Sequence, residues 1–133
     1  MTYYLDSNII IFALKNKVPG LKEKIRSFSR SKIKVPSMTA AELIAGAYKS
    51  KKVEENLHVA FCFMEPYETV PFDADASEIY GKIKSEMEAG GNTIGPNDMV
   101  IAATVMSRGG ILITNNVKEF EHVKGLQIED WTQ

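Results

Sequence analysis

The sequence predicts a three-layer α/β domain in which a central, mostly parallel sheet of about five strands is flanked by helices. Short apolar segments of high β-propensity alternate along the chain with longer segments of helical periodicity, and this alternation is typical of parallel α/β folds. The 133 residues suffice for one such unit, so we expect a single domain over residues 1–133. The composition, 44% hydrophobic and 25% charged, is that of a globular protein.

Five short segments are predicted to be strands because they combine β-prone or apolar residues with polar or helix-breaking boundaries. They lie at 2–5, 33–35, 68–71, 111–114 and 126–128. Helices are predicted at about 9–14, 21–29, 39–50, 53–64, 73–88 and 99–107, and the last is apolar almost all round and therefore expected to be buried. Ser7 or Asn8 is the expected N-cap of the first helix, and Trp131 is expected to anchor the C-terminus by packing.

Positive and negative charges are unevenly distributed along the chain, although the net charge is only -1. Residues 1–53 contain eleven Lys and Arg against three acids, a net charge of +8, whereas residues 54–133 carry a net charge of -9. A basic segment suits a polyanionic partner such as nucleic acid, but lysines on solvated helices would give the same pattern. The pI of about 6.1 is also well below that of a dedicated nucleic-acid binder.

The expected compartment is the cytoplasm. The single cysteine, Cys62, cannot form an intramolecular disulfide, and it stands in an apolar helical run where we expect it to pack. No stretch approaches the roughly 18 apolar residues of a membrane span. The first residues also lack the features of a secretory signal.

Three acidic residues are predicted to meet at one edge of the sheet. Asp6 follows the first strand, Glu42 lies in the first turn of the helix after the second, and Asp98 begins the helix that leads into the fourth. Open parallel sheets bind their ligands beyond the carboxyl ends of the strands, where the strand order reverses. Carboxylates brought together there repel one another unless a cation is present, and hard oxygen ligands suit Mg²⁺ or Mn²⁺. Such an ion can activate water for attack on a phosphodiester.

Each acid also has a purely structural interpretation. Asp6 could cap the helix that follows it, and Asp98 could offset a helix dipole. Thr39 and Glu42 match a T-x-x-E capping box, and Glu119 could be an ordinary solvated residue. Only the combined arrangement of these positions indicates a metal-dependent site.

Four segments together resemble the PIN-domain ribonucleases of the VapC type, the toxins of bacterial type II VapBC toxin–antitoxin pairs. The segments are Tyr4-Leu5-Asp6-Ser7-Asn8; Thr39-Ala40-Ala41-Glu42-Leu43 with Gly46-Ala47; Gly95-Pro96-Asn97-Asp98 with Ile101-Ala102-Ala103; and Thr114 to Trp131. The last segment, TNNVKEFEHVKGLQIEDW, is the most specific. The resemblance extends over essentially the whole chain, in order and at the expected spacings.

The resemblance implies that Asp6 and Asp98 hold Mg²⁺, with Mn²⁺ as an alternative, and that Glu42 completes the acidic site. Many PIN domains carry an aspartate two residues beyond the threonine that follows the fourth strand, but this chain has Asn116 there. Glu119 matches the acid of the VapC branch and is the expected fourth acid, either as a ligand of a second ion or behind the ligands of the first. The number of metal ions stays open. Residues expected to orient water or substrate are Ser7, Asn8, Thr114, Asn115 and Asn116.

The resemblance also implies an endoribonuclease toxin that inhibits translation until a cognate VapB-type antitoxin neutralises it. The expected substrate is tRNA, in the anticodon region of initiator tRNA, because similar members with the same C-terminal motif include nucleases that cleave it. A nuclease of ribosomal RNA or mRNA is the alternative, as is a non-catalytic RNA-binding or regulatory PIN domain. A homodimer, a higher toxin–antitoxin complex and an antitoxin C-terminal segment that blocks the active-site groove are implied as well.

Overall fold

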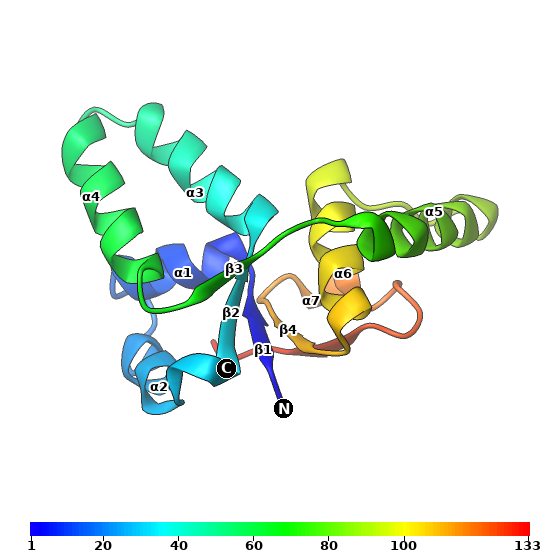
Figure 1. Cartoon of the computed structure of the whole chain (residues 1–133), viewed down its shortest axis with the longest axis horizontal. Coiled ribbons are helices and arrows are strands. Elements are labelled where there is room, and N and C mark those ends of the chain that lie inside the picture. Colours follow the sequence, from blue (N-terminus) through cyan, green and yellow to red (C-terminus); the bar gives the residue numbers. More distant parts are fainter.

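The computed structural model describes residues 1–133 and has the predicted α/β architecture, with a five-stranded sheet between helices (Figure 1). The strands are β1 (Tyr3–Leu5), β2 (Ile33–Pro36), β3 (Glu68–Val70), β4 (Ile111–Ile113) and β5 (Gln127–Glu129). Their order is β3-β2-β1-β4-β5, and all four neighbouring pairs are parallel. The sheet is therefore wholly parallel, as expected of strands joined by crossover connections.

Seven α-helices and one 3₁₀ turn connect the strands. They are α1 (Ser7–Leu14), α2 (Leu21–Ser27), η1 (Arg30–Lys32), α3 (Ser37–Tyr48), α4 (Val53–Met64), α5 (Ala74–Ala89), α6 (Pro96–Arg108) and α7 (Val117–Phe120). The first six α-helices agree with the sequence prediction, whereas α7 was not predicted because one turn carries too little periodicity to be recognised. No helix has the length and apolar character needed to cross a membrane.

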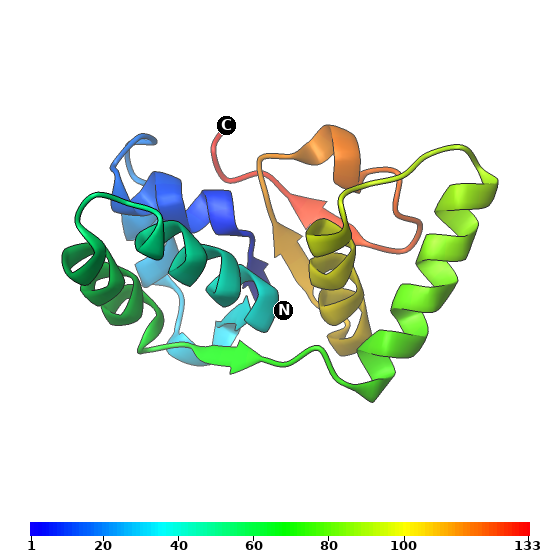
Figure 2. The ribbon, with the colours of Figure 1, turned by 90° about the horizontal axis from the view of Figure 1, so that it is seen from above.

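Two hydrophobic clusters lie on opposite faces of the sheet. Ile111 and Ile113 of β4 belong to one cluster and Leu112 between them to the other, because successive side chains of a strand alternate between its faces. Residues of α1 to α4 complete the first cluster, and residues of α5, α6 and α7 complete the second (Figures 1 and 2). Helices therefore cover both faces, and α6 is buried as predicted.

Trp131 anchors the C-terminal turn on the first cluster, as expected from the sequence. Its side chain is buried, and its ring stacks on that of Phe28 with centroids 5.2 Å apart and an interplanar angle of 6°. Two other predictions are wrong. Cys62 is exposed, because α4 turns Ala60, Phe63 and Met64 inward instead. Ser7 and Asn8 do not cap α1; the N-cap is Asp6, the other candidate from the sequence, which accepts a hydrogen bond from the backbone N–H that follows it.

The strand order reverses between β1 and β4. The chain adds β2 and β3 on one side of β1 and then returns to add β4 and β5 on the other. The carboxyl ends of β1 and β4 at such a reversal are the usual ligand position in open parallel sheets. The first turns of α1, α3 and α6 lie at the same edge, and α3 and α6 flank it (Figure 2).

Candidate active site

Asp6 lies at the carboxyl end of β1 with only 4% of its surface exposed. Its backbone N–H donates to the Ile113 carbonyl at 3.0 Å, which continues the pairing of β1 with β4. Its Oδ1 accepts from the Ser7 N–H at 2.9 Å, and its Oδ2 accepts from Thr114 Oγ1 at 2.8 Å. Burial raises the pKa of Asp6, the two hydrogen bonds counteract that rise, and the charge of Glu42 adds to it. The Asp6 carboxyl group is thus held in one orientation by Ser7, which follows β1, and by Thr114, which follows β4.

Glu42 reaches the site from α3 through Ser7, whose Oγ donates to Glu42 Oε1 at 3.1 Å. Thr39, one turn earlier, is fully buried, and its Oγ1 donates to the Leu5 carbonyl at 2.9 Å. This bond ties the start of α3 to the end of β1. The capping-box interpretation of Thr39 and Glu42 is therefore wrong, since α3 begins at Ser37 and has no side-chain cap.

Asp98 lies in the first turn of α6 and is partly exposed. Its pKa is raised to about 7, first by burial and then by the negative charges of Asp6, Glu119 and Glu42. A hydrogen bond with Glu119 also favours the protonated form of Asp98. The four predicted acids are therefore close enough to affect the ionisation of one side chain, although they come from four separate segments of the chain.

A chain of hydrogen bonds connects Glu119 to Asp6. Asn116 Nδ2 donates to Glu119 Oε2 at 3.1 Å, and the Asn116 N–H donates to Thr114 Oγ1 at 3.0 Å. Thr114 Oγ1 in turn donates to Asp6. The sequence left open whether Glu119 or Asn116 completes the acidic group. The two side chains are in contact, so both belong to this cluster.

Two of the predicted polar residues, Asn8 and Asn115, form no side-chain hydrogen bond to the acids. Asn8 is exposed in the first turn of α1 and makes no side-chain hydrogen bond to the acids. Asn115 Oδ1 is the one buried side-chain oxygen or nitrogen that lacks a hydrogen-bond partner. It is an acceptor without a donor, which is unfavourable unless a water or another group donates to it.

The donor set suits a partly hydrated divalent cation. Its members are hard carboxylate oxygens, and their mutual repulsion, which contributes to the raised pKa of Asp98, is what a cation would relieve. No three acidic, histidine or cysteine side chains stand close enough to hold one ion by themselves. Mg²⁺ and Mn²⁺ do not require that, because they keep several waters and use one or two carboxylates.

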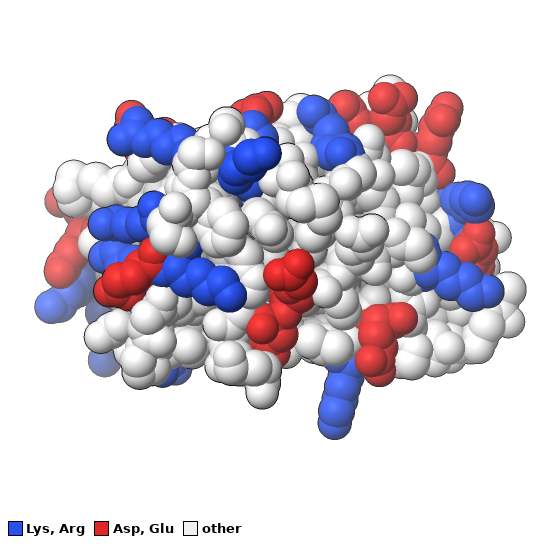
Figure 3. Space-filling view, turned by 90° about the horizontal axis from the view of Figure 1, so that it is seen from below, with Lys and Arg blue, Asp and Glu red and all other residues white.

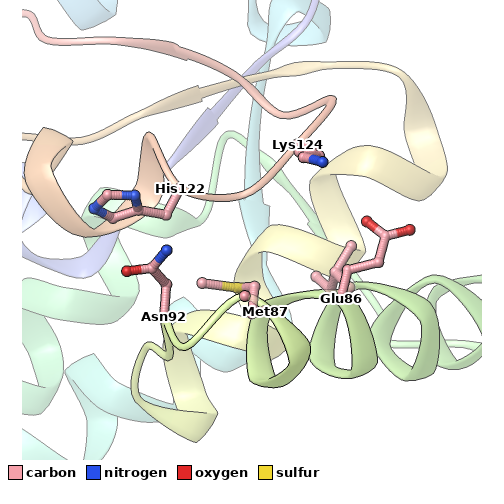
Figure 4. A pocket seen from close by; sticks show the side chains of 7 residues that line it. Glu86, Met87, Asn92, His122 and Lys124 are labelled. Carbon is pink, nitrogen blue, oxygen red and sulfur yellow. The ribbon is translucent and has the colours of Figure 1, made fainter.

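Two pockets lie near these elements. The larger, about 420 Å³, lies between α1, α3 and α4, and the acid Glu42 stands among mostly apolar lining residues that include Ile11, Leu14, Leu43, Ala47 and Val59. The smaller, about 120 Å³, lies between the end of α5 and the segment after α7 (Figure 4). Its labelled residues are Glu86, Met87, Asn92, His122 and Lys124, with none of the predicted site residues among them.

The sequence of the chain matches the family model of the PIN domain over residues 3–126. The chain belongs to the PIN-domain family. Among PIN domains its relatives are VapC proteins. It is 40% identical, over 99% of each chain, to the tRNA(fMet)-specific endonuclease VapC of Shigella flexneri. It is 38% identical, over 98% of each chain, to the protein of the same name from Salmonella typhimurium.

Solved structures of VapBC complexes confirm the fold of this PIN domain. VapBC2 from Rickettsia felis, bound to a DNA fragment of its promoter, aligns with a TM-score of 0.92 and 32% identity over 98% of this chain and 99% of that one. DNA-bound VapBC from Salmonella typhimurium aligns with a TM-score of 0.92 and 38% identity over 98% of both. The predicted family and the α/β architecture are thus both confirmed.

Proposed function

We propose that this PIN domain is a metal-dependent endoribonuclease toxin that hydrolyses phosphodiester bonds in tRNA. The observation that carries the proposal is the convergence of Asp6, Glu42, Asp98 and Glu119 at the carboxyl ends of β1 and β4, which helps to raise the pKa of Asp98 to about 7. The two VapC relatives that are 40% and 38% identical to the chain are tRNA(fMet)-specific endonucleases. Their names support initiator tRNA as the target here. Cleavage in its anticodon region is part of the proposal.

Asp6 and Asp98 are the proposed ligands of Mg²⁺ or Mn²⁺. Glu42 is the proposed third acid and would act on the ion through its bound waters, because three acids are not close enough to hold the ion directly. When bound, the ion supplies an activated water and neutralises charge that develops at the phosphate. Ser7 and Thr114 keep Asp6 in a fixed orientation through the bonds of 2.9 and 2.8 Å.

The remaining polar residues have proposed roles in proton transfer and substrate binding. Glu119 lies beside Asp98 and contributes to the rise of its pKa. Because Asp98 is a proposed metal ligand, Glu119 is the proposed acceptor of the proton that the attacking water releases as its oxygen bonds to phosphorus, while the phosphorus–oxygen ester bond breaks and its oxygen leaves with the bonding electrons. Asn115 Oδ1, which lacks a donor, is the proposed acceptor for an ordered water or an RNA 2′-hydroxyl. Asn116 positions Glu119, and the exposed Asn8 is available to the substrate itself.

The proposed regulator is an antitoxin protein of the VapB type. The matching solved structures are VapBC complexes. The apolar pocket of about 420 Å³ between α1, α3 and α4 includes Glu42 in its lining, so an antitoxin segment seated there would reach the acidic site. We also propose that the protein forms a homodimer and that this dimer assembles with the antitoxin into a larger complex in the cytoplasm.

The experiment is to incubate the purified protein with total cellular RNA and Mg²⁺ and to map the new 5′ ends. Asp6→Asn and Asp98→Asn should each abolish cleavage, whereas Asp75→Asn, an exposed acid in the first turn of α5, should not affect it. EDTA should stop the reaction, and Mg²⁺ or Mn²⁺ should restore it.

The pattern of cuts decides between the alternatives. One dominant cut in the anticodon region of initiator tRNA supports the proposal in full. Dominant cuts in ribosomal RNA or mRNA would replace the substrate but keep the chemistry. Binding of RNA without cleavage under any metal condition would identify a non-catalytic PIN domain. Equal cleavage by wild type and both aspartate variants would overturn the assigned site.

A further inference from the structure

Positive charge is concentrated in one stretch of the chain, residues 15–32, which contains none of the acids of the candidate site. We call this the basic surface; it runs from the end of α1 through α2 to η1 and consists of Lys15, Lys17, Lys22, Lys24, Arg26, Arg30 and Lys32. Within residues 15–32 the only acid is Glu23. In Figure 3, lysine and arginine side chains are most frequent at one end of the molecule, where several carboxylates also lie.

None of these seven cations is neutralised by an ion pair. The three salt bridges of the structure join Lys34 to Glu68, Lys52 to Glu55 and Arg108 to Asp73, and all six of these residues lie outside the basic surface. Six of the seven side chains are exposed, and Lys22 is half-buried. Lys24 is the most restrained of the group, because its Nζ lies 4.8 Å from the centre of the Trp131 ring. The surface therefore presents free positive charge to solvent.

The basic surface begins near the acidic site, where Lys15 lines the same pocket as Glu42, and it extends to the edge of the sheet opposite the acids. Arg30 and Lys32 come directly before β2 and therefore lie at the amino end of that strand. Asp6 lies at the carboxyl end of β1, which pairs in parallel with β2. In Figure 1, α2 lies beside the lower end of β2, whereas α3 and the start of α6 lie toward the upper end of the sheet. A ligand that touches both sites has to extend along the side of the domain.

We propose that the basic surface binds the phosphate backbone of RNA at a distance from the bond that is cleaved. The inference rests on the proposed function, since the acidic site requires an RNA substrate that its own carboxylates repel. Ammonium and guanidinium groups that are free of carboxylates attract phosphates and release counterions, which supplies affinity without sequence preference. RNA held in this way must be long enough to reach both edges of the sheet. Full-length tRNA should therefore bind more tightly than a short anticodon hairpin.

The test measures RNA binding in EDTA, so that it does not depend on cleavage. Fluorescently labelled full-length tRNA and an isolated anticodon stem-loop are titrated with the wild type and with the triple variant Arg26→Gln, Arg30→Gln, Lys32→Gln. For tRNA the variant should raise Kd about tenfold at near-physiological salt, and the slope of log K against log salt should become shallower by about two to three. For the stem-loop the two proteins should differ by less than about twofold.

Two further proteins serve as controls. Lys51→Gln, Lys82→Gln, Lys84→Gln removes the same charge from exposed positions elsewhere and should leave the Kd for tRNA nearly unchanged. Arg26→Lys, Arg30→Lys, Lys32→Arg keeps the charge and should restore wild-type binding, which separates loss of charge from misfolding. Equal weakening by both neutralised triple variants would overturn the proposal, because net charge alone would then explain the effect.

Two further outcomes test whether the basic surface binds RNA. Unchanged tRNA affinity in the first triple variant would overturn the proposal, and a simultaneous loss of antitoxin binding would assign the surface to a protein partner instead. Failure of the proposed function has a different signature, since the wild type would then cut no RNA in Mg²⁺ whatever the outcome of the binding measurements.

Discussion

Thr114 Oγ1 donates a hydrogen bond of 2.8 Å to Asp6 Oδ2, joining two buried residues that are 108 positions apart in the sequence. The same hydroxyl oxygen accepts from the Asn116 N–H at 3.0 Å, so its proton has to point toward the carboxyl group. Thr114 therefore acts as a fixed donor to Asp6. Its effect on chemistry is exerted through the orientation of that side chain, which makes it a positioning residue.

Thr114→Val removes this donor while keeping the shape of the side chain. Supporting hydrogen bonds of metal ligands typically contribute 10- to 100-fold to metal affinity or activity. We therefore expect the Mg²⁺ concentration for half-maximal cleavage to rise by about tenfold or more. Thr114→Ser keeps the hydroxyl and should stay near wild type. A Val variant with wild-type Mg²⁺ dependence would show that this bond does not position a metal ligand.

Asp98 should make the stability of the metal-free protein depend on pH. Its pKa in the folded protein is about 7, raised from an ordinary value of 3.8, so the folded state keeps a proton that the unfolded chain releases. The stabilisation from this protonation is fully present below the unfolded pKa and is lost as pH rises through about 7. Thermal unfolding should show Asp98→Asn to be the more stable protein at pH 8, with the difference disappearing toward pH 4.

Mg²⁺ provides the control for the Asp98 prediction. The ion should raise the melting temperature of the wild type at pH 8 and have little effect on Asp98→Asn, because the variant lacks a proposed ligand. Cleavage at fixed low Mg²⁺ should fall as pH drops below 7, since protons and the ion compete for the same carboxylate. An unfolding difference between the two proteins that is constant from pH 4 to 8 would contradict the assignment of the raised pKa to Asp98.

Glu119 and Asn116 should behave as a coupled pair. Glu119→Gln removes the charge and should lower cleavage by roughly 10- to 100-fold, whereas Asn116→Ala removes only the 3.1 Å bond and should cost roughly tenfold or less. The double variant should be little worse than Glu119→Gln alone, because Asn116 is proposed to act through Glu119. Fully multiplicative losses, measured as cleavage rates at saturating Mg²⁺, would mean that Asn116 has a separate role.

Trp131→Ala should reduce stability without reducing the intrinsic cleavage rate. The variant loses the stacking on Phe28 and leaves a cavity in the first hydrophobic cluster, for a cost of about 3 kcal/mol in the free energy of unfolding. Trp131→Phe keeps part of the packing and should lose less. Urea unfolding followed by circular dichroism gives the stability, and cleavage below the unfolding transition gives the rate. A large rise in KM for tRNA with little loss of stability would instead mean that the ring contacts RNA.

Local chemistry made much of the fold and of the acidic site predictable. The strand ends and helix starts could be recognised from β-propensity, glycine, proline and helical periodicity, since these act within a few residues. The rule that parallel strands share a carboxyl edge then placed Asp6, Glu42 and Asp98 together, and the structure has this arrangement. The C-terminal motif added Glu119, which no periodic pattern would have distinguished from a solvated acid.

The sequence by itself determined the succession of strands and helices along the chain, the buried character of α6 and the positions of the acids at the ends of these elements. Only the tertiary structure decided which groups form hydrogen bonds to the acids and to the residues around them. Thr39 bonds to the Leu5 carbonyl and forms no capping box with Glu42, and the structure selects Asp6 from the three candidate caps of α1, which were Asp6, Ser7 and Asn8. Cys62, expected to pack, faces solvent. The physical reason is that propensity and periodicity act over one or two turns, whereas hydrogen-bond partners and electrostatic neighbours are set by packing between distant segments.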